Sequence, residues 1–399
     1  MRKSQFRELT SVDLNAFRRF RRTTDPLEQL DRFIRFDGEA LQVRIDGPWQ
    51  TLRGTGAGSG SPAAPPDPSP IHEVRDLRGL RIVLDPGHRG GAWSHEEDRH
   101  IAVGPGPAVR EGDIAYAVAV QLQRMLEVRG AKVRMTRGPA PARPFPSGQL
   151  AGYDPLVEAA QWSTELAHVA ALEPVARWRH TSIGRWAAPF FVRALTTVSP
   201  FKLYNRYELR RRAEIAAQFD PHVTLSLHFN VARDPLTNGI IVFVLGNFLH
   251  NELATASQRY YALRALTSGA LEPARRLGVT LGRAMQQELD LPALSEPSDS
   301  PVGLAKKIPL APEDGVFARN LAMLRRTPGV VLLLEGPCMN AVGEFERLQR
   351  GDVQVEGLGV VSERTTQYAR AVVRGLAAHR DALIRWKKAE ARRTRSVAK

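Results

Sequence analysis

The length, composition and charge of the chain exclude several classes of protein. Its 399 residues are 43% hydrophobic and 25% charged, as is typical of a soluble, globular protein with one large or two modest domains. No window approaches the roughly 18 apolar residues of a transmembrane segment, and the single cysteine, Cys338, excludes an intramolecular disulfide framework and a cysteine-based zinc cluster. The net charge of +14 predicts a polyanionic neighbour, but no nucleic-acid-binding motif is present, so we expect no nucleic-acid partner.

The first part of the chain is predicted to form a small N-terminal module. Residues 1–52 combine charged, helix-like stretches with two strand-like segments, LQVRI (41–45) and PWQTL (48–52). Residues 53–74 are rich in Gly, Pro and Ser and cannot bury enough apolar surface to fold, so they are interpreted as a linker. The first residues carry charges throughout and lack an apolar stretch, so no signal peptide is visible in the sequence.

Residues 75–391 alternate between strands and helices and are predicted to be the main domain. The predicted strands are short, mostly apolar and rich in β-branched residues: RIVLD (81–85), AKVRMT (131–136), HVTLSLHF (222–229), GIIVFVL (239–245) and GVVLLLE (329–335). The predicted helices are 113–126, with Asp113 as its N-cap, and 207–219, 274–289, 315–326 and 361–390. This alternation predicts an α/β fold with a mostly parallel central sheet and helices on both faces.

Two further segments depart from this alternation. Residues 138–205 make a connection far longer than usual and contain aromatic, helix-like pieces. We interpret them as an inserted helical subdomain, with a lid, an autoinhibitory plug or a surface for a regulatory protein as its candidate roles. Residues 392–399 are predicted to be a basic tail, and Cys338 is expected to be buried near a strand end.

Four polar residues stand where strands end or a helix begins. His88 follows the first strand, His228 and Glu335 end the third and the last, and Glu111 precedes the helix at 113–126. Because ligands of open α/β sheets bind outside the carboxyl ends of the strands, the fold is expected to gather these residues at one edge. A simpler explanation is that His88 is a polar residue of a turn and that Glu111 is a carboxylate favoured near a helix N-terminus. Glu335 resists such an explanation, since five apolar residues precede it and a buried charge must be paired, protonated or bound to a metal.

Together these residues indicate a hydrolytic metal site. Two imidazoles and a carboxylate are a common ligand set for catalytic zinc, which keeps its fourth position open for water. A further carboxylate can take the proton of that water and pass it to a leaving amine. Two histidines and two glutamates match this division of roles.

Several sequence blocks resemble a known family when taken in order. They are LDPGHRGG (84–91), REGD (110–113), LRRRAEIAAQFD (209–220) with SLHFN (226–230), and NLAMLRRTPGVVLLLEG (320–336). Spread over roughly residues 80–380, they resemble the zinc-dependent N-acetylmuramoyl-L-alanine amidases of the AmiC-like family.

That resemblance implies a substrate and a set of roles. It implies hydrolysis of the amide between N-acetylmuramic acid and L-alanine of the peptidoglycan stem peptide, in the periplasm or cell envelope. It places one Zn²⁺ per chain on His88, Glu111 and His228, makes Glu335 the catalytic residue, and puts Asn230 beside the site. Another zinc peptidase or amidohydrolase on the same scaffold, or a non-catalytic cell-wall-binding protein, are the alternatives.

The chain departs from the family pattern around these residues. Arg89 follows His88 where the family has His-Gly-Gly, and the sequence offers no reason for it. The interval before Glu111 is longer than usual and contains Glu96 and Glu97, which are alternative ligands. Phe229 replaces the usual alanine, and GPCMN follows the strand at 329–335. Arg326, shortly before the last strand, is a candidate to pair with a carboxylate of the stem peptide.

Overall fold

A computed structural model describes residues 29–37, 40–45, 47–53, 76–103, 106–139, 200–248, 250–253, 256–294 and 308–397. Residues 54–74 of the predicted linker, most of the predicted insertion and the helices expected before residue 29 lie outside these ranges. None of the helices in the described part of the chain is long and apolar enough to cross a membrane.

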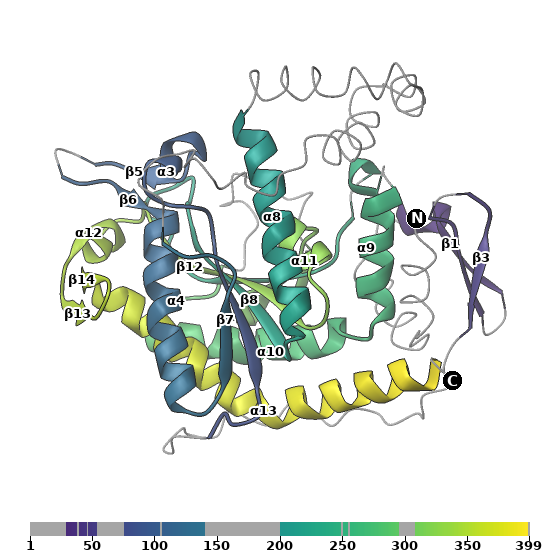
Figure 1. The fold of residues 1–399 in the computed structure, drawn as a ribbon. Coiled ribbons are helices and arrows are strands. Elements are labelled where there is room, and N and C mark those ends of the chain that lie inside the picture. The colour runs from purple at the N-terminus through teal and green to yellow at the C-terminus, as the bar shows by residue number, and fades with distance from the viewer. Residues whose placement is uncertain are drawn as a thin grey trace.

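The centre of the fold is a seven-stranded sheet in the order β10-β11-β9-β12-β8-β4-β7. Strands β7, β8 and β12 of this sheet are labelled in Figure 1. Its strands are β4 (Arg81–Pro86), β7 (Lys132–Met135), β8 (Val223–Asn230), β9 (Ile241–Val244), β10 (Ile308–Ala311), β11 (Val316–Ala318) and β12 (Val331–Cys338). β7, β4, β8 and β12 are parallel to one another, as are β9 and β11, whereas the β9–β12 and β10–β11 pairs are antiparallel. The predicted mostly parallel sheet is confirmed.

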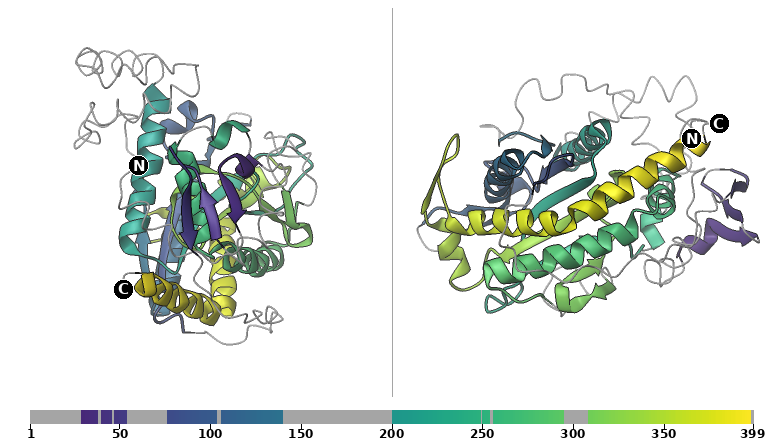
Figure 2. Two further views of the ribbon diagram at one scale, coloured as in Figure 1. Left: turned by 90° about the vertical axis from the view of Figure 1, so that its right-hand side faces the viewer. Right: turned by 90° about the horizontal axis from the view of Figure 1, so that it is seen from below.

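Helices cover both faces of this sheet, as the sequence predicts. One face carries α4 (Glu111–Val128), α10 (Leu271–Leu289) and α13 (Glu363–Val397), and α10 and α13 run side by side (Figure 2). The other face carries α8 (Pro200–Phe219), α9 (Ala256–Thr267) and α11 (Ala322–Arg326).

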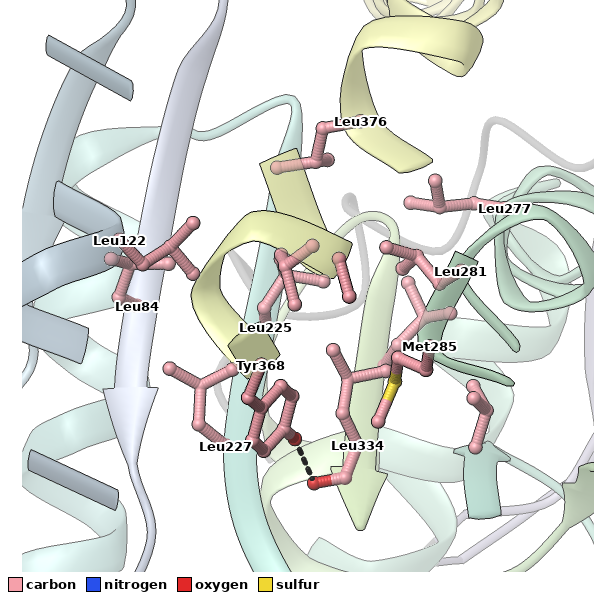
Figure 3. Close-up of a cluster of buried hydrophobic side chains, with 14 of the residues drawn as sticks. Leu84, Leu122, Leu225, Leu227, Leu277, Leu281, Met285, Leu334, Tyr368 and Leu376 are labelled. Carbon is pink, nitrogen blue, oxygen red and sulfur yellow. Dashed lines mark hydrogen bonds between the residues drawn. The ribbon is translucent and has the colours of Figure 1, made fainter. Parts of the chain in front are cut away.

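The alternation of side chains along the strands divides the core in two. In β8, Leu225 and Leu227 point toward α4 and α13, so Ser226 and His228 point toward the face of α8 and α11. On the apolar side, the hydroxyl of Tyr368 donates to the carbonyl of Leu334 at 2.8 Å and fixes α13 against β12 (Figure 3). The opposite face is therefore the one that carries polar groups at the strand ends.

The N-terminal module is a three-stranded antiparallel sheet of β1 (Ile34–Asp37), β2 (Ala40–Val43) and β3 (Gln50–Arg53). Its buried side chains, Leu41 and Leu52 among them, belong to the same hydrophobic cluster as Phe243 and Phe317 of the central sheet. Arg259 of α9 donates to the carbonyl of Ile45 at 2.9 Å. The module is thus packed onto the α9 side of the main domain.

The remaining described elements are short. They are η1 (Gln29–Arg32), α3 (Trp93–Glu96), β5 (His100–Ile101), β6 (Val109–Arg110), η2 (His250–Leu253), η5 (Pro312–Asp314), α12 (Glu344–Gln349), β13 (Val353–Val355) and β14 (Gly359–Val361). Cys338 is buried at the end of β12, as expected.

Three sequence-based predictions about the elements are wrong. The helix predicted at 315–326 is strand β11 followed by α11, because Val316–Ala318 are all buried between β9 and β10 and show no helical alternation. Asp113 is not the N-cap of α4; that position is Arg110, and the Asp113 side chain accepts from the backbone N–H of Gly91 at 2.9 Å. Helix α13 continues to Val397, through most of the predicted tail.

Candidate metal centre

His88 follows β4 on a loop with an unusual backbone conformation. Its φ of 50° lies in the left-handed region, which few non-glycine residues adopt. Two buried arginines hold the carbonyls of this loop: Arg212 donates to His88 at 2.8 Å, and Arg137 donates to Gly87 at 2.9 Å. Side chains from distant parts of the chain therefore support the loop that carries His88.

His228 lies beside this loop because β8 and β4 are paired. Leu227 is opposite Pro86 in the register, and the rings of His88 and His228 meet edge to face with centroids 5.0 Å apart. A Cβ on Gly87 would lie 2.5 Å from Cε1 and Nδ1 of His228, well inside van der Waals contact. Glycine at position 87 thus leaves the space that the His228 ring occupies.

Glu111 joins the two histidines. It is the first residue of α4 and is 2% exposed. Its Oε1 lies 2.9 Å from Nδ1 of His228 and accepts from the backbone N–H of Phe229 at 3.2 Å, and its Oε2 lies 3.2 Å from Nε2 of His88. Gly90 and Gly112 allow this approach, because a Cβ on Gly112 would fall 2.1 Å from the backbone nitrogen of Gly90.

The charges of this cluster depend on one another. Burial raises the pKa of Glu111, but the two imidazoles outweigh it and hold that pKa well below its usual range. Burial lowers the pKa of His88, but Glu111 and Glu97 outweigh it and raise that pKa to about 9. Without a metal, the cluster therefore pairs an ionised Glu111 carboxylate with a protonated His88 imidazole.

The donor set of this cluster is one that proteins use to hold metal ions such as zinc. His88, Glu111 and His228 each offer one ligand atom, and these atoms lie within 4.8 Å of one another. Two nitrogens and one oxygen from the protein leave one position of a tetrahedral ion for water or substrate. The structure thus brings the three predicted ligands together as a group that could hold a metal ion.

Glu335 lies next to this group on β12. It is opposite His228 in the parallel β12–β8 register, so both side chains point to the same face of the sheet. Its Oε2 atom is buried and has no hydrogen-bond partner among the described residues. Burial and the Glu111 carboxylate raise the pKa of Glu335 against the opposing pull of His228. An unpartnered carboxylate that tends to keep its proton is suited to acid–base chemistry.

Asn230 ends β8 two residues beyond His228, on the same face of the strand. Its Oδ1 accepts from the backbone N–H of Val231 at 2.9 Å. Its Nδ2 is buried and has no hydrogen-bond partner among the described residues. The side chain is thus anchored on one side and keeps a free amide donor on the other.

The two alternative glutamates differ from Glu111 in position. Glu97 lies behind His88, with Oε1 3.7 Å from Nδ1 of that ring and Oε2 accepting from the backbone N–H of Arg89 at 3.0 Å. Glu97 faces Nδ1 of the His88 ring, whereas Glu111 faces Nε2. Glu97 therefore does not belong to the ligand group. The side chain of Glu96 lies outside the described residues.

The structure does not bring Arg326 to the cluster. It is the last residue of α11, at the amino end of β12, where its carbonyl accepts from Arg264 of α9. The arginine whose charge acts on Glu335 is instead Arg319, which follows β11 and lies over the ring of Phe243 at 5.4 Å. Burial lowers the pKa of Arg319, and the charge of Glu335 opposes this shift. The sequence-based prediction missed Arg319 because it assigned the segment to a helix.

Arg89 now has a structural explanation. Its guanidinium is buried and donates to Glu208 of α8 at 2.8 Å, and the same carboxylate oxygen accepts from Arg212 at 2.7 Å. Arg212 also contacts Asp85 at 3.3 Å. Helix α8 is therefore joined to the loop of His88 by a buried ionic network. A sequence signal existed: Glu208 and Arg212 are four residues apart and share a helix face.

Comparisons with known proteins give a limited likeness. No protein-family model and no curated protein matches the chain. Among solved structures, it is similar to the N-acetylmuramyl-L-alanine amidase Ami1 from Mycobacterium smegmatis, with 15% identity, a TM-score of 0.39 and coverage of 77% of this chain and 99% of that one. It is also similar to the CwlD amidase from Clostridioides difficile, solved with the GerS lipoprotein, with 14% identity, a TM-score of 0.38 and coverage of 77% and 98%.

A third similar structure is N-acetylmuramoyl-L-alanine amidase AmiC2 of Nostoc punctiforme, with 16% identity, a TM-score of 0.35 and coverage of 74% of this chain and 94% of that one. At such low TM-scores and identities, the likeness by itself decides neither family nor activity. Function has to be inferred from the residues of the site.

Proposed function

We propose that the protein is a zinc-dependent N-acetylmuramoyl-L-alanine amidase that acts on peptidoglycan. The observation that carries the proposal is the placement of Glu335 opposite His228, beside a group of two histidines and one carboxylate that could hold a metal ion. The sequence blocks that resemble the AmiC-like amidases contain these same four residues. The substrate has to be reached outside the cytoplasm, so the proposal includes a location in the periplasm or cell envelope.

In this proposal, His88, Glu111 and His228 hold the zinc ion. A bound zinc would supply a Lewis acid for the amide carbonyl and lower the pKa of its water to about 7. Glu111 spans both histidines with its two oxygens and therefore keeps the ligand set together before metal arrives. The protein contributes a largely buried, preassembled set of donors.

Glu335 is proposed to move the proton. Its unpartnered Oε2 accepts a proton from the attacking water and donates it to the amine nitrogen of L-alanine as the C–N bond breaks. The raised pKa favours the protonated form that has to persist until the leaving amine takes the proton. Asn230 is proposed to donate its free Nδ2 hydrogen to an acceptor of the substrate.

Digestion of purified sacculi followed by mass spectrometry tests the proposal. Release of intact stem peptides from glycan strands is the expected result. Shortened stems would indicate a peptidase, and an unchanged wall that still binds the protein would indicate a binding protein.

A Glu335→Gln variant tests the role of the carboxylate. It should bind about one zinc per chain, as the wild type does, yet release stem peptides about 10²–10⁴-fold more slowly. Glu346→Gln is the matched control, since Glu346 is exposed on α12. Equal rates for the two variants would refute the role of Glu335.

A further inference from the structure

The two nitrogens of the His88 ring face two different carboxylates. Nε2 faces Glu111 at 3.2 Å, on the side of the candidate metal, and Nδ1 faces Glu97 at 3.7 Å, on the far side. The side chain of Glu97 is 9% exposed, so water screens this interaction little. The negative charge of Glu97 therefore favours a proton on Nδ1 and leaves Nε2 as the nitrogen available to a metal.

The position of Glu97 is itself fixed by its surroundings. Its second carboxylate oxygen accepts from the backbone N–H of Arg89 at 3.0 Å, and its own backbone N–H donates to the carbonyl of Trp93 at 2.9 Å. Trp93 is 1% exposed and anchors the short helix α3, which ends just before Glu97. Glu97 thus connects the loop that carries His88 to helix α3, which the buried Trp93 holds in place.

The backbone on the other side of His88 is also held. Arg212 binds the carbonyl of His88, and Arg89 is tied to Glu208 on α8. With the backbone fixed in its left-handed conformation, rotation of the imidazole about its side-chain bonds is the main freedom that remains. The contact with Glu97 restricts that rotation.

We propose that Glu97 is a positioning residue that orients the ring of His88 and presents its Nε2 atom to the metal. The inference rests on the metal-binding part of the proposed function and does not depend on the substrate. A carboxylate behind a ligating histidine fixes its tautomer and raises its basicity, and loss of such a partner typically weakens metal affinity about 10–100-fold. Glu97 lies in the long interval between His88 and Glu111, so the extra residues there acquire a role.

Zinc affinity, measured by competition with a chromophoric chelator, tests the inference. We expect Glu97→Ala to bind zinc about 10–100-fold more weakly than the wild type. Glu97→Gln keeps an oxygen that can face Nδ1 but loses the charge, so its zinc affinity should lie between that of the wild type and that of Glu97→Ala. Glu346→Ala, on an exposed glutamate, should bind like the wild type.

A spectroscopic signature separates orientation from general damage to the fold. Cobalt(II)-loaded Glu97→Ala should show shifted d–d bands relative to wild type, whereas Glu346→Ala should not. Wild-type affinity and an unchanged cobalt spectrum in Glu97→Ala would overturn the inference. If that variant does not fold, wild-type affinity in Glu97→Gln overturns it instead.

The two proposals fail in distinguishable ways. A wild-type protein that binds no zinc contradicts both. Zinc binding that weakens in Glu97→Ala, in a protein that releases no stem peptides from sacculi, supports the role of Glu97 and contradicts the amidase proposal.

Discussion

Substitution of Gly87 by alanine is expected to damage the metal centre through a single methyl group. The Cβ would lie 2.5 Å from Cε1 and Nδ1 and 2.7 Å from Nε2 of His228, whereas ordinary contacts begin near 3.4 Å. The ring would have to retreat by almost 1 Å, and metal–ligand distances tolerate only about 0.2 Å. No positive φ is recorded at this position, so the backbone itself accepts an alanine.

The energy of this clash sets the expected magnitude. Overpacking a fitted site by one methyl group costs about 1–3 kcal/mol. If that strain acts on the zinc-bound form, the zinc affinity falls by about fivefold to 150-fold. Chelator competition gives the affinity, and the melting temperature without metal reports damage to the fold.

Gly138→Ala is the matched control for this experiment. A Cβ there meets no described atom within 4 Å, so zinc affinity should stay at the wild-type value. Equal zinc affinities for Gly87→Ala and Gly138→Ala would refute the reasoning, because they would show that the His228 ring does not depend on the space at position 87.

Three further predictions concern stability. The pKa of His88 rises from 6.5 to about 9 on folding, so its protonated ring stabilises the metal-free protein by about 3 kcal/mol below pH 6.5, and this contribution is lost as the pH rises to 9. The melting temperature of the wild type should therefore fall between pH 6.5 and 9, and this fall should be lost in His88→Asn. An equal fall in His88→Asn would contradict the assignment. Arg212→Met leaves the buried carboxylate of Asp85 without its cation and leaves Glu208 with Arg89 alone, so urea denaturation should show a loss of about 3–5 kcal/mol, and a loss below 1 kcal/mol would argue against the network. Tyr368→Phe removes the hydroxyl that donates to the carbonyls of Leu334 and His228 and should cost about 1–2 kcal/mol in the same assay, and a loss near zero would contradict the role of this buried hydroxyl.

The sheet and most of the site were predictable because they follow from local pattern. Short apolar runs gave β4, β8, β9 and β12, and the rule that parallel strands share one carboxyl edge predicted that polar residues at strand ends would meet. Where the pattern was ambiguous, the prediction was wrong. Val316–Ala318 are too few residues to show whether their period is that of a strand or a helix, and only pairing with β9 and β10 decides it.

From the sequence by itself, His88, Glu111 and His228 were identified as candidate metal ligands and Glu335 as a candidate proton carrier, from their places at the ends of elements and from the resemblance to the AmiC-like amidases. Only the tertiary structure decided what supports them. Arg89 looked unexplained in the sequence because its partner, Glu208, is 119 residues away. The physical reason is that strand and helix signals are carried by neighbours along the chain, whereas buried ionic contacts are made between elements and depend on how the whole fold packs.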